Sequence, residues 1–248
     1  MPFTFSHPAA IVPFRYFPKK WFSMTGLIIG SMSPDFEYFL RMKVLSIYSH
    51  TWGGLFWFDL PLTIVLAFVF HLLIRDVAID NLPDFLRRRL IMFKRFQWIT
   101  NFKSNYIIVI ISVIVGAATH ILWDGFTHPA GQFVRELPAL RQTIAVRHYS
   151  FPIYNVLQHA SSLFGGLVVI YSIANLPETK LPPRQKAILS YWYLVGTICL
   201  FTVLLRIFLS SRAVNIAEIG VSIFSGGLLG LIISSVFFRS TLSGRRLR

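Results

Sequence analysis

Five long runs of apolar residues constrain this chain more than any other feature of its sequence. They cover residues 55–74, 106–123, 156–174, 188–209 and 214–238. A helix needs about 20 mainly apolar residues to cross the hydrocarbon core of a bilayer, and each run approaches or exceeds that length. We therefore predict an all-α fold, a multi-pass transmembrane bundle with about five spanning helices.

The composition excludes an ordinary water-soluble domain. Hydrophobic residues make up 54% of the chain and charged residues only 14%, whereas a soluble domain is usually about 45–50% apolar and about a quarter charged. The single cysteine, Cys199, allows no disulfide within one chain. The first 20 residues lack the apolar core and cleavage site of a signal peptide, so we count them as part of the mature protein.

The net charge of +14 is better explained by membrane topology than by nucleic acid. The basic residues are spread over all loops without a groove-reading motif, so we expect no nucleic-acid partner. With five spans, the loops 75–103 and 175–187 and the C-terminal tail share one side and carry fourteen Lys and Arg, against ten on the other side. This bias predicts that the first side is cytoplasmic and that the N-terminus is outside.

Two further segments complete the expected architecture. Residues 21–40 are too polar to face lipid, so we predict a short helix or a re-entrant segment packed against the bundle. The amphipathic run LPDFLRRRLIMFKRF, residues 82–96, is typical of a helix on the membrane surface. We divide the chain into residues 1–165, with the first two spans and the candidate site, and residues 166–248, which complete the same membrane domain.

Most of the chain's histidines map to one side of this topology, together with two aspartates. The residues on that side are His7, Asp35, His50, His120, Asp124, His128, His148 and His159. Only His71 lies at the opposite end of its span, where we interpret it as structural, beside Arg75. The grouping holds whichever way the chain is inserted, and it predicts a polar site at one membrane face.

The sequence THILWD places His120 and Asp124 four residues apart in a helical pattern. This spacing puts both side chains on one helix face, with Cβ atoms about 5–6 Å apart, so that they could chelate one divalent ion. Zinc accepts both histidine nitrogen and carboxylate oxygen. The alternative is a helix end at which the histidine only forms a hydrogen bond and the aspartate caps the next turn.

Similar alternatives stay open for the other candidates. Asp35, in a Ser-Pro-Asp turn, is either a ligand or a turn residue, and His50 is either a ligand or a histidine at the membrane interface. Asp59 lies inside a span, so we expect its carboxylate to orient a ligand histidine by accepting a hydrogen bond from the free ring N–H of that histidine. Glu37 supports the site from behind or is solvated, and His159 faces the bundle as a ligand or as a hydrogen-bonded histidine.

Four motifs resemble an uncharacterised bacterial family of multi-pass membrane proteins. They are MPFTFSHPAA, GSMSPDFEYF, SHTWGGLFWFDLP and THILWDGFTH. More distantly, their order is similar to inner-membrane proteins classed as metal-dependent hydrolases and to the zinc-dependent phospholipase C superfamily. The resemblance implies a bacterial inner membrane, and the Lys and Arg count above predicts that the site is on its extracytoplasmic side.

The resemblance also implies a ligand set. Asp35, His50, His120 and Asp124 match the residues that hold one zinc in that superfamily, and His7 matches a ligand of another zinc that the last aspartate bridges. His128 and His159 are candidates for the remaining zinc. The glutamate expected four residues after the last histidine is missing, because Leu163 follows His159 at that offset. One or two ions are therefore expected rather than three.

These observations favour a metal-dependent hydrolase of phosphoesters, with a lipid-linked or phosphate-bearing substrate. We expect Asp35 and Asp124 to act as catalytic carboxylates, and Arg135, Arg141 or Arg147 to hold a phosphate. Membrane lipids are the expected partners. The alternative is a non-enzymatic membrane protein, either a transporter or a scaffold, whose metal site is structural or degenerate.

Overall fold

A computed structural model describes residues 3–18, 20–146, 148–181, 188–211 and 213–243. Within these residues the fold is helical, with one small two-stranded sheet, and the predicted all-α bundle is confirmed. Five helical segments of this described part are long and apolar enough to cross a membrane: Leu55–Asp80, Trp98–Glu136, Ile153–Ala174, Leu189–Phe208 and Ile216–Arg239.

The second of these segments is much longer than its apolar run. The run 106–123 lies inside the helix α6, Trp98–Thr127, which continues past it at both ends. Hydropathy detects only the apolar middle of a helix, whereas backbone hydrogen bonding continues through polar residues. The C-terminal extension matters most, because it keeps Asp124 on the same continuous helix as His120.

The chain divides into two compact units that are interleaved along the sequence. The first contains residues 1–35, 47–64 and 102–173, and the second contains residues 36–46, 65–101 and 174–248. We predicted two consecutive segments instead, divided after residue 165, and that division stays a prediction. All the residues of the candidate site described below belong to the first unit.

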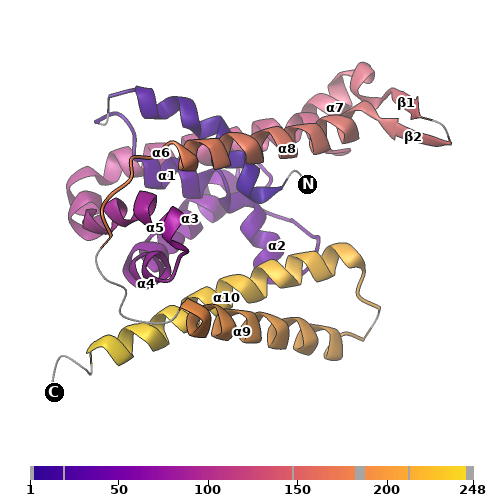
Figure 1. The fold of residues 1–248 in the computed structure, drawn as a ribbon. Helices are drawn as coiled ribbons and strands as arrows, with labels where there is room; N and C mark the ends of the chain where they lie inside the picture. Colours follow the sequence, from indigo (N-terminus) through magenta and orange to yellow (C-terminus); the bar gives the residue numbers. More distant parts are fainter. Residues whose placement is uncertain (1–2, 19, 147, 182–187, 212, 244–248) are drawn as a thin grey trace. The chain divides into compact units, whose positions relative to one another are not determined.

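The first unit combines short N-terminal helices with two spans (Figure 1). Its elements, in chain order, are η1 (Thr4–Tyr16), α1 (Met24–Gly30), η2 (Ser33–Asp35), η3 (Leu55–Asp59), the first half of α3 (Leu60–Val69), most of α6, α7 (Gln132–Glu136), η6 (Pro138–Arg141), β1 (Thr143–Val146), β2 (Tyr149–Pro152) and α8 (Ile153–Ala174). Within the predicted weak segment 21–40, α1 and η2 are the part that belongs to this unit.

The N-terminal arm η1 docks onto α8 through backbone and hydroxyl groups. The Phe3 N–H donates to Ser162 Oγ at 2.9 Å, and Ser6 Oγ donates to the Ser162 carbonyl at 2.7 Å. Gly165 makes this approach possible, because a Cβ there would lie only 2.8 Å from the Ser6 carbonyl oxygen. These contacts hold His7, one residue after Ser6, in the buried interior of the unit.

Helix α1 packs against α6 at very close range. A Cβ on Gly26 would lie 3.0 Å from the Val109 carbonyl oxygen, and one on Gly30 would lie 2.6 Å from the Val113 carbonyl oxygen. Gly26 and Gly30 are four residues apart and so share one face of α1, the spacing by which small residues let two membrane helices approach. The close approach brings the end of α1 alongside the middle of α6.

The two-stranded sheet is an antiparallel hairpin between α6 and α8 that the sequence analysis did not predict. Its register pairs Ile144 with Phe151, so these side chains share a face, and Tyr149 joins them because side chains two residues apart point the same way. All three are exposed. The hairpin runs directly into α8, so its apolar face lies at the boundary of a spanning helix.

The second unit consists of helices and contains the last two spans. Its elements are α2 (Phe36–Arg41), the second half of α3, η4 (Phe70–Ile74), α4 (Arg75–Asp80), α5 (Asp84–Leu90), η5 (Ile91–Arg95), the start of α6, α9 (Ile188–Phe208) and α10 (Ile216–Ser243). Helices α9 and α10 run side by side (Figure 1). Gly226 and Gly230 allow their contact, since Cβ atoms there would lie 2.9 Å from the Cys199 carbonyl and 2.7 Å from the Val195 carbonyl.

The glycine contact between α1 and α6 generates a stability prediction. Gly30→Ala places a methyl group against the backbone of α6, which cannot move aside easily, and overpacking of this kind destabilises by about 1–3 kcal/mol. We expect a lower thermal midpoint, measured in detergent by fluorescence-detected unfolding. Gly196→Ala is the matched control, because a Cβ there meets no atom within 4 Å. Equal midpoints for the two variants would contradict the close packing.

Candidate metal centre

Four side chains of the first unit converge on one point. Asp35, His50, His120 and Asp124 each present one potential ligand atom, and these atoms all lie within 4.8 Å of one another. Asp35 and His120 are fully buried, and Asp124 is 5% exposed. We call these four residues the quartet.

Local structure explains how each member reaches this point. Asp35 ends the short 3₁₀ turn η2, after Pro34, and so projects from a rigid corner. His50 lies in the turn before the π-helical segment η3, where Thr51 Oγ1 accepts a hydrogen bond from the Gly54 N–H at 2.9 Å. His120 and Asp124 lie one turn apart on α6, as their spacing predicts.

The distances within the quartet suit a shared ion better than direct hydrogen bonds. His50 Nε2 lies 3.5 Å from Asp35 Oδ1 and 3.4 Å from Asp124 Oδ2. His120 Nε2 lies 3.6 Å from Asp35 Oδ1 and 3.4 Å from Asp124 Oδ2. Charged hydrogen bonds are shorter, at about 2.7–2.9 Å. Two ligands about 2.0–2.2 Å from a tetrahedral zinc are about 3.3–3.6 Å apart, which matches all four distances.

Neighbouring groups orient three members of the quartet by binding the atom that faces away from its centre. His120 Nδ1 donates to the Ser31 carbonyl at 2.7 Å, which leaves Nε2 as the lone-pair nitrogen. His50 Nδ1 lies 3.0 Å from Ser49 Oγ. Thr4 Oγ1 donates to Asp35 Oδ2 at 2.5 Å. Metal-ligating histidines usually have such a partner on the second nitrogen, and ligating carboxylates are hydrogen-bonded in turn.

Several buried polar atoms that face the centre have no hydrogen-bond partner among the described residues. They are Asp35 Oδ1, His120 Nε2 and Asp124 Oδ2. A buried polar atom without a partner costs free energy, and a buried charge costs more. A divalent cation would satisfy all of these atoms at once, and two carboxylates with two neutral imidazoles would balance its charge.

Two more histidines flank the quartet. His7 Nε2 lies 3.6 Å from Asp124 Oδ1, and the His7 ring stacks on the His120 ring with centroids 3.7 Å apart. His128 Nδ1 lies 3.4 Å from Asp124 Oδ2. Asp124 therefore faces the quartet and His128 with Oδ2 and faces His7 with Oδ1. His7 is buried, whereas the side chain of His128 is 21% exposed.

The electrostatic environment differs between the groups outside the spanning helices. Burial, together with the neighbouring His120, lowers the pKa of His7 to about 3, so His7 stays neutral. Burial alone would raise the pKa of Asp35, but His120 outweighs it and holds this pKa below its usual range. Burial alone would lower the pKa of His50, but Asp124 and Asp35 outweigh it and raise this pKa.

The donor set fits a divalent cation that prefers nitrogen and oxygen ligands. Imidazole suits zinc, copper, iron and nickel, and carboxylate suits harder ions such as manganese. The four converging side chains of the quartet supply two imidazole nitrogens and two carboxylate oxygens. The geometry identifies a candidate metal centre without naming its ion.

The remaining predicted site residues lie elsewhere. His159 is exposed on α8, and His148 is exposed in the hairpin turn. Arg135 is exposed on α7, and Arg141 Nε donates to the Val134 carbonyl at 2.7 Å. Arg147 lies outside the described residues. A ligand role for His159 and phosphate binding by the arginines stay predictions.

The two predicted supporting carboxylates are both buried. Asp59 ends the π-helical turn η3, and its backbone carbonyl accepts a hydrogen bond from Thr63 Oγ1 at 2.6 Å. Glu37 belongs to the second unit, where it pairs with Arg41 at 2.8 Å and accepts a hydrogen bond from Ser46 Oγ at 3.0 Å. Their supporting roles at the site stay predictions.

Sequence reasoning missed the groups that orient the ligands. Thr4 and Asp35 are 31 residues apart, and Ser31 and His120 are 89 residues apart. No periodicity connects positions so distant, and the Ser31 partner is a backbone carbonyl that any residue would supply. Only Ser49, adjacent to His50, could have been proposed from the sequence.

These features define a class, that of helical proteins with five potential spans and a buried cluster of histidine and aspartate. The chain belongs to the family described as Domain of unknown function (DUF4184), which it matches over residues 1–236. The match includes the whole quartet and both flanking histidines. No curated protein and no solved structure matches the chain significantly. The expectation of an uncharacterised family is confirmed.

The environment of His50 predicts how metal binding depends on pH. An ion must displace the proton that the raised pKa of His50 retains in the metal-free protein. The apparent zinc affinity should therefore rise with pH, by about tenfold per unit from His50 alone while the pH is below that pKa, and less steeply above it. Competition with a chelating dye at a series of pH values measures this slope.

The folding stability of the metal-free protein should show the opposite pH dependence, because the contribution of His50 to stability falls as the pH rises. A pKa raised by folding contributes stability that is fully present below the unfolded value and is lost as the pH rises through the folded value. A zinc affinity that does not change over this pH range would mean that His50 is not a ligand.

Thermal stabilisation by zinc separates the predicted ligands. A ligand that binds only the folded state stabilises it by about 2.7 kcal/mol when its free concentration is about 100 times its dissociation constant. We expect zinc to raise the thermal midpoint of the wild type and to have little effect on His120→Ala. Gly196→Ala is the control and should respond as the wild type does, because a Cβ there meets no atom within 4 Å. If both variants keep the response, the quartet does not hold the ion.

Proposed function

We propose that this protein is a metal-dependent hydrolase of phosphoester bonds, with a lipid-linked substrate at one membrane face. The observation that carries the proposal is the quartet, whose four facing atoms have the mutual spacing of ligands to one ion. A bound divalent ion would supply an activated water and polarise a phosphoryl oxygen. Zinc is the ion that we propose.

The protein groups suggest separate roles for the two predicted catalytic carboxylates. Asp35 has one oxygen bound to Thr4 and the other directed at the centre. Asp124 directs Oδ2 at the centre and keeps Oδ1 toward His7. Asp124 Oδ1 is therefore the better placed oxygen to accept a proton from the attacking water. The neutral His7 ring beside it adds no positive charge that would oppose this transfer.

Access to the centre is proposed from the side of His50 and His128. Their side chains are 20% and 21% exposed, whereas His7 and His120 are buried behind them. The exposed arginines Arg135 and Arg141, in the connection that follows α6, are proposed to hold the substrate phosphate. A centre on a spanning helix favours a substrate that resides in the bilayer.

The proposal gains support from the order of the ligands along the chain. Asp35, His50, His120 and Asp124 match the zinc ligands of the phospholipase C superfamily in identity and order, and His7 matches the ligand of a neighbouring zinc. The departure at Leu163, where that pattern has a glutamate, argues for fewer ions. The positive-inside count and the resemblance support a bacterial inner membrane with the centre on its outer side.

A structural metal centre is the second candidate. Four protein ligands complete a tetrahedron, whereas catalytic zinc sites usually have three and keep the fourth position for water. The quartet joins η2, the turn before η3 and helix α6, so an ion there would cross-link distant parts of the first unit. Catalysis would then require the ion to accept a fifth ligand.

Turnover distinguishes the two candidates. We expect the zinc-loaded protein in detergent to hydrolyse bis-p-nitrophenyl phosphate or phospholipid in mixed micelles. Asp124→Asn should lower kcat by about a hundredfold or more, since general base catalysis contributes about 10²–10⁴-fold. Gly196→Ala, where a Cβ meets no atom within 4 Å, serves as the control with full activity. Stoichiometric metal without turnover of either substrate would reject the hydrolase and leave the structural centre.

A further inference from the structure

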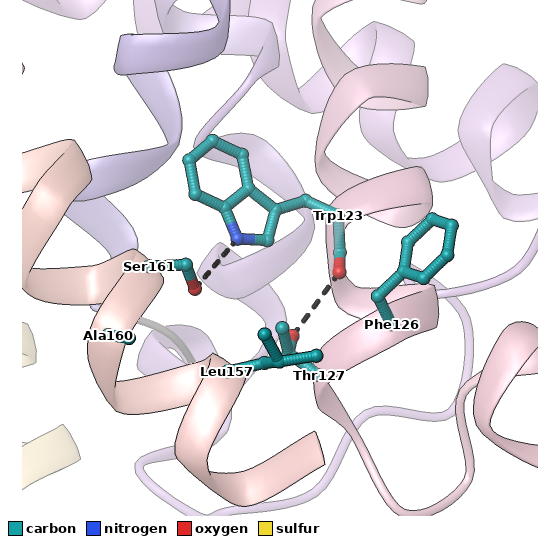
Figure 2. A pocket seen from close by; sticks show the side chains of 6 residues that line it. All are labelled: Trp123, Phe126, Thr127, Leu157, Ala160 and Ser161. Carbon is teal, nitrogen blue, oxygen red and sulfur yellow. Dashed lines mark hydrogen bonds between the residues drawn. The ribbon is translucent and has the colours of Figure 1, made fainter. Parts of the chain in front are cut away.

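An apolar groove of about 330 Å³ lies between α6 and α8, next to the candidate metal centre. Its walls are Trp123, Phe126 and Thr127 from α6, and Leu157, Ala160 and Ser161 from α8 (Figure 2). The volume is at the lower end of the range for small-molecule sites, about 300–1,000 Å³. Both walls belong to helices long and apolar enough to span a membrane.

The polar groups of these walls are bonded to other protein groups. Trp123 Nε1 donates to Ser161 Oγ at 3.1 Å, and Thr127 Oγ1 donates to the Trp123 carbonyl at 3.2 Å (Figure 2). Ser161 Oγ in turn donates to the Gln158 carbonyl at 3.3 Å. With its donors used in this way, the groove offers a molecule mainly hydrocarbon contacts. Such a lining favours an alkyl chain over a sugar, a peptide or a nucleotide.

The groove neighbours the metal centre along α6, although none of its lining residues belongs to the quartet. Trp123 and Asp124 are adjacent in the sequence, and the Trp123 ring lies 5.4 Å from the ring of His7. His7 Nε2 lies 3.6 Å from Asp124 Oδ1. The Trp123 ring is therefore separated from Asp124 by the single ring of His7.

We propose that this groove binds one hydrocarbon chain of a membrane phospholipid, so that the phosphate of that lipid lies at the quartet. The proposal rests on the proposed function and defines its substrate by the chain as well as by the phosphoester. Leu157 and Ala160 on α8 then determine which chains fit, because they form the wall opposite Phe126. Trp123 positions the junction between chain and head group.

Photolabelling tests the groove without any need for turnover. The probe is phosphatidic acid with a diazirine on one acyl chain, mixed at increasing fractions into nanodiscs that contain the full chain. After irradiation, peptides from 120–130 and 154–164 are quantified by mass spectrometry. We expect labelling at the groove residues that saturates at low probe fraction, whereas contact with bulk lipid rises in proportion to it.

Variants that fill the groove provide the second comparison. Ala160→Leu and Leu157→Trp replace exposed or partly exposed side chains by larger ones, so we expect both variants to fold. They should lower the saturable labelling by about fivefold or more, because a filled groove no longer encloses a chain. Leu163→Trp is the matched control, since Leu163 is 67% exposed on the same helix and does not line the groove.

Hydrolysis of two substrates separates this proposal from the proposed function. In wild type, a long-chain phosphoester should have a lower KM than a short-chain one with the same head group, and Ala160→Leu should remove that difference while kcat for the short chain is unchanged. Saturable labelling without turnover of either substrate would support the groove and reject the hydrolase. The groove proposal would be overturned if the protein turns over substrate but its labelling only rises in proportion to the probe fraction. It would also be overturned if Ala160→Leu leaves the labelling unchanged.

Discussion

The hydrogen bond from His120 Nδ1 to the Ser31 carbonyl joins the two segments on which the candidate centre depends. Ser31 directly follows α1, and α1 reaches α6 only because Gly26 and Gly30 present no side chain to it. The same bond determines which nitrogen of His120 faces the quartet. Helix packing, ring orientation and ligand geometry are therefore consequences of one close contact between backbones.

A second constraint is the free energy of burying charge in an apolar bundle. The first unit buries two carboxylates and two imidazoles, those of Asp35, Asp124, His7 and His120, within a few ångströms of one another. Ionisable groups inside membrane segments are expensive, and they are retained where they have a function. A shared cation explains why these groups approach at 3.4–3.6 Å instead of forming direct hydrogen bonds. The substrate that we propose would place its charged head at the centre and its chain in the flanking groove.

The sequence predicted the long apolar helices because a mainly apolar run of about 20 residues has the length that a helix needs to cross a bilayer. It also predicted the pairing of His120 with Asp124, since helical periodicity relates residues four apart. The convergence of Asp35 and His50 on that pair required the order of motifs, because no local rule connects a turn before the first span to a helix 70 residues later. The partners of the ligands, Thr4 and the Ser31 carbonyl, and the hairpin β1–β2 depend on tertiary packing that a single sequence does not reveal.

Metal content is the most direct test of the central claim. The chain would be purified in detergent, loaded with zinc, freed of unbound ion and analysed by mass spectrometry for metal per chain, beside the double variant His120→Ala with Asp124→Ala. The account predicts at least one ion in the wild type and none in the double variant. An absence of bound metal in the wild type, after loading with zinc and with manganese, would contradict it, and the quartet would then be a buried polar cluster of the fold.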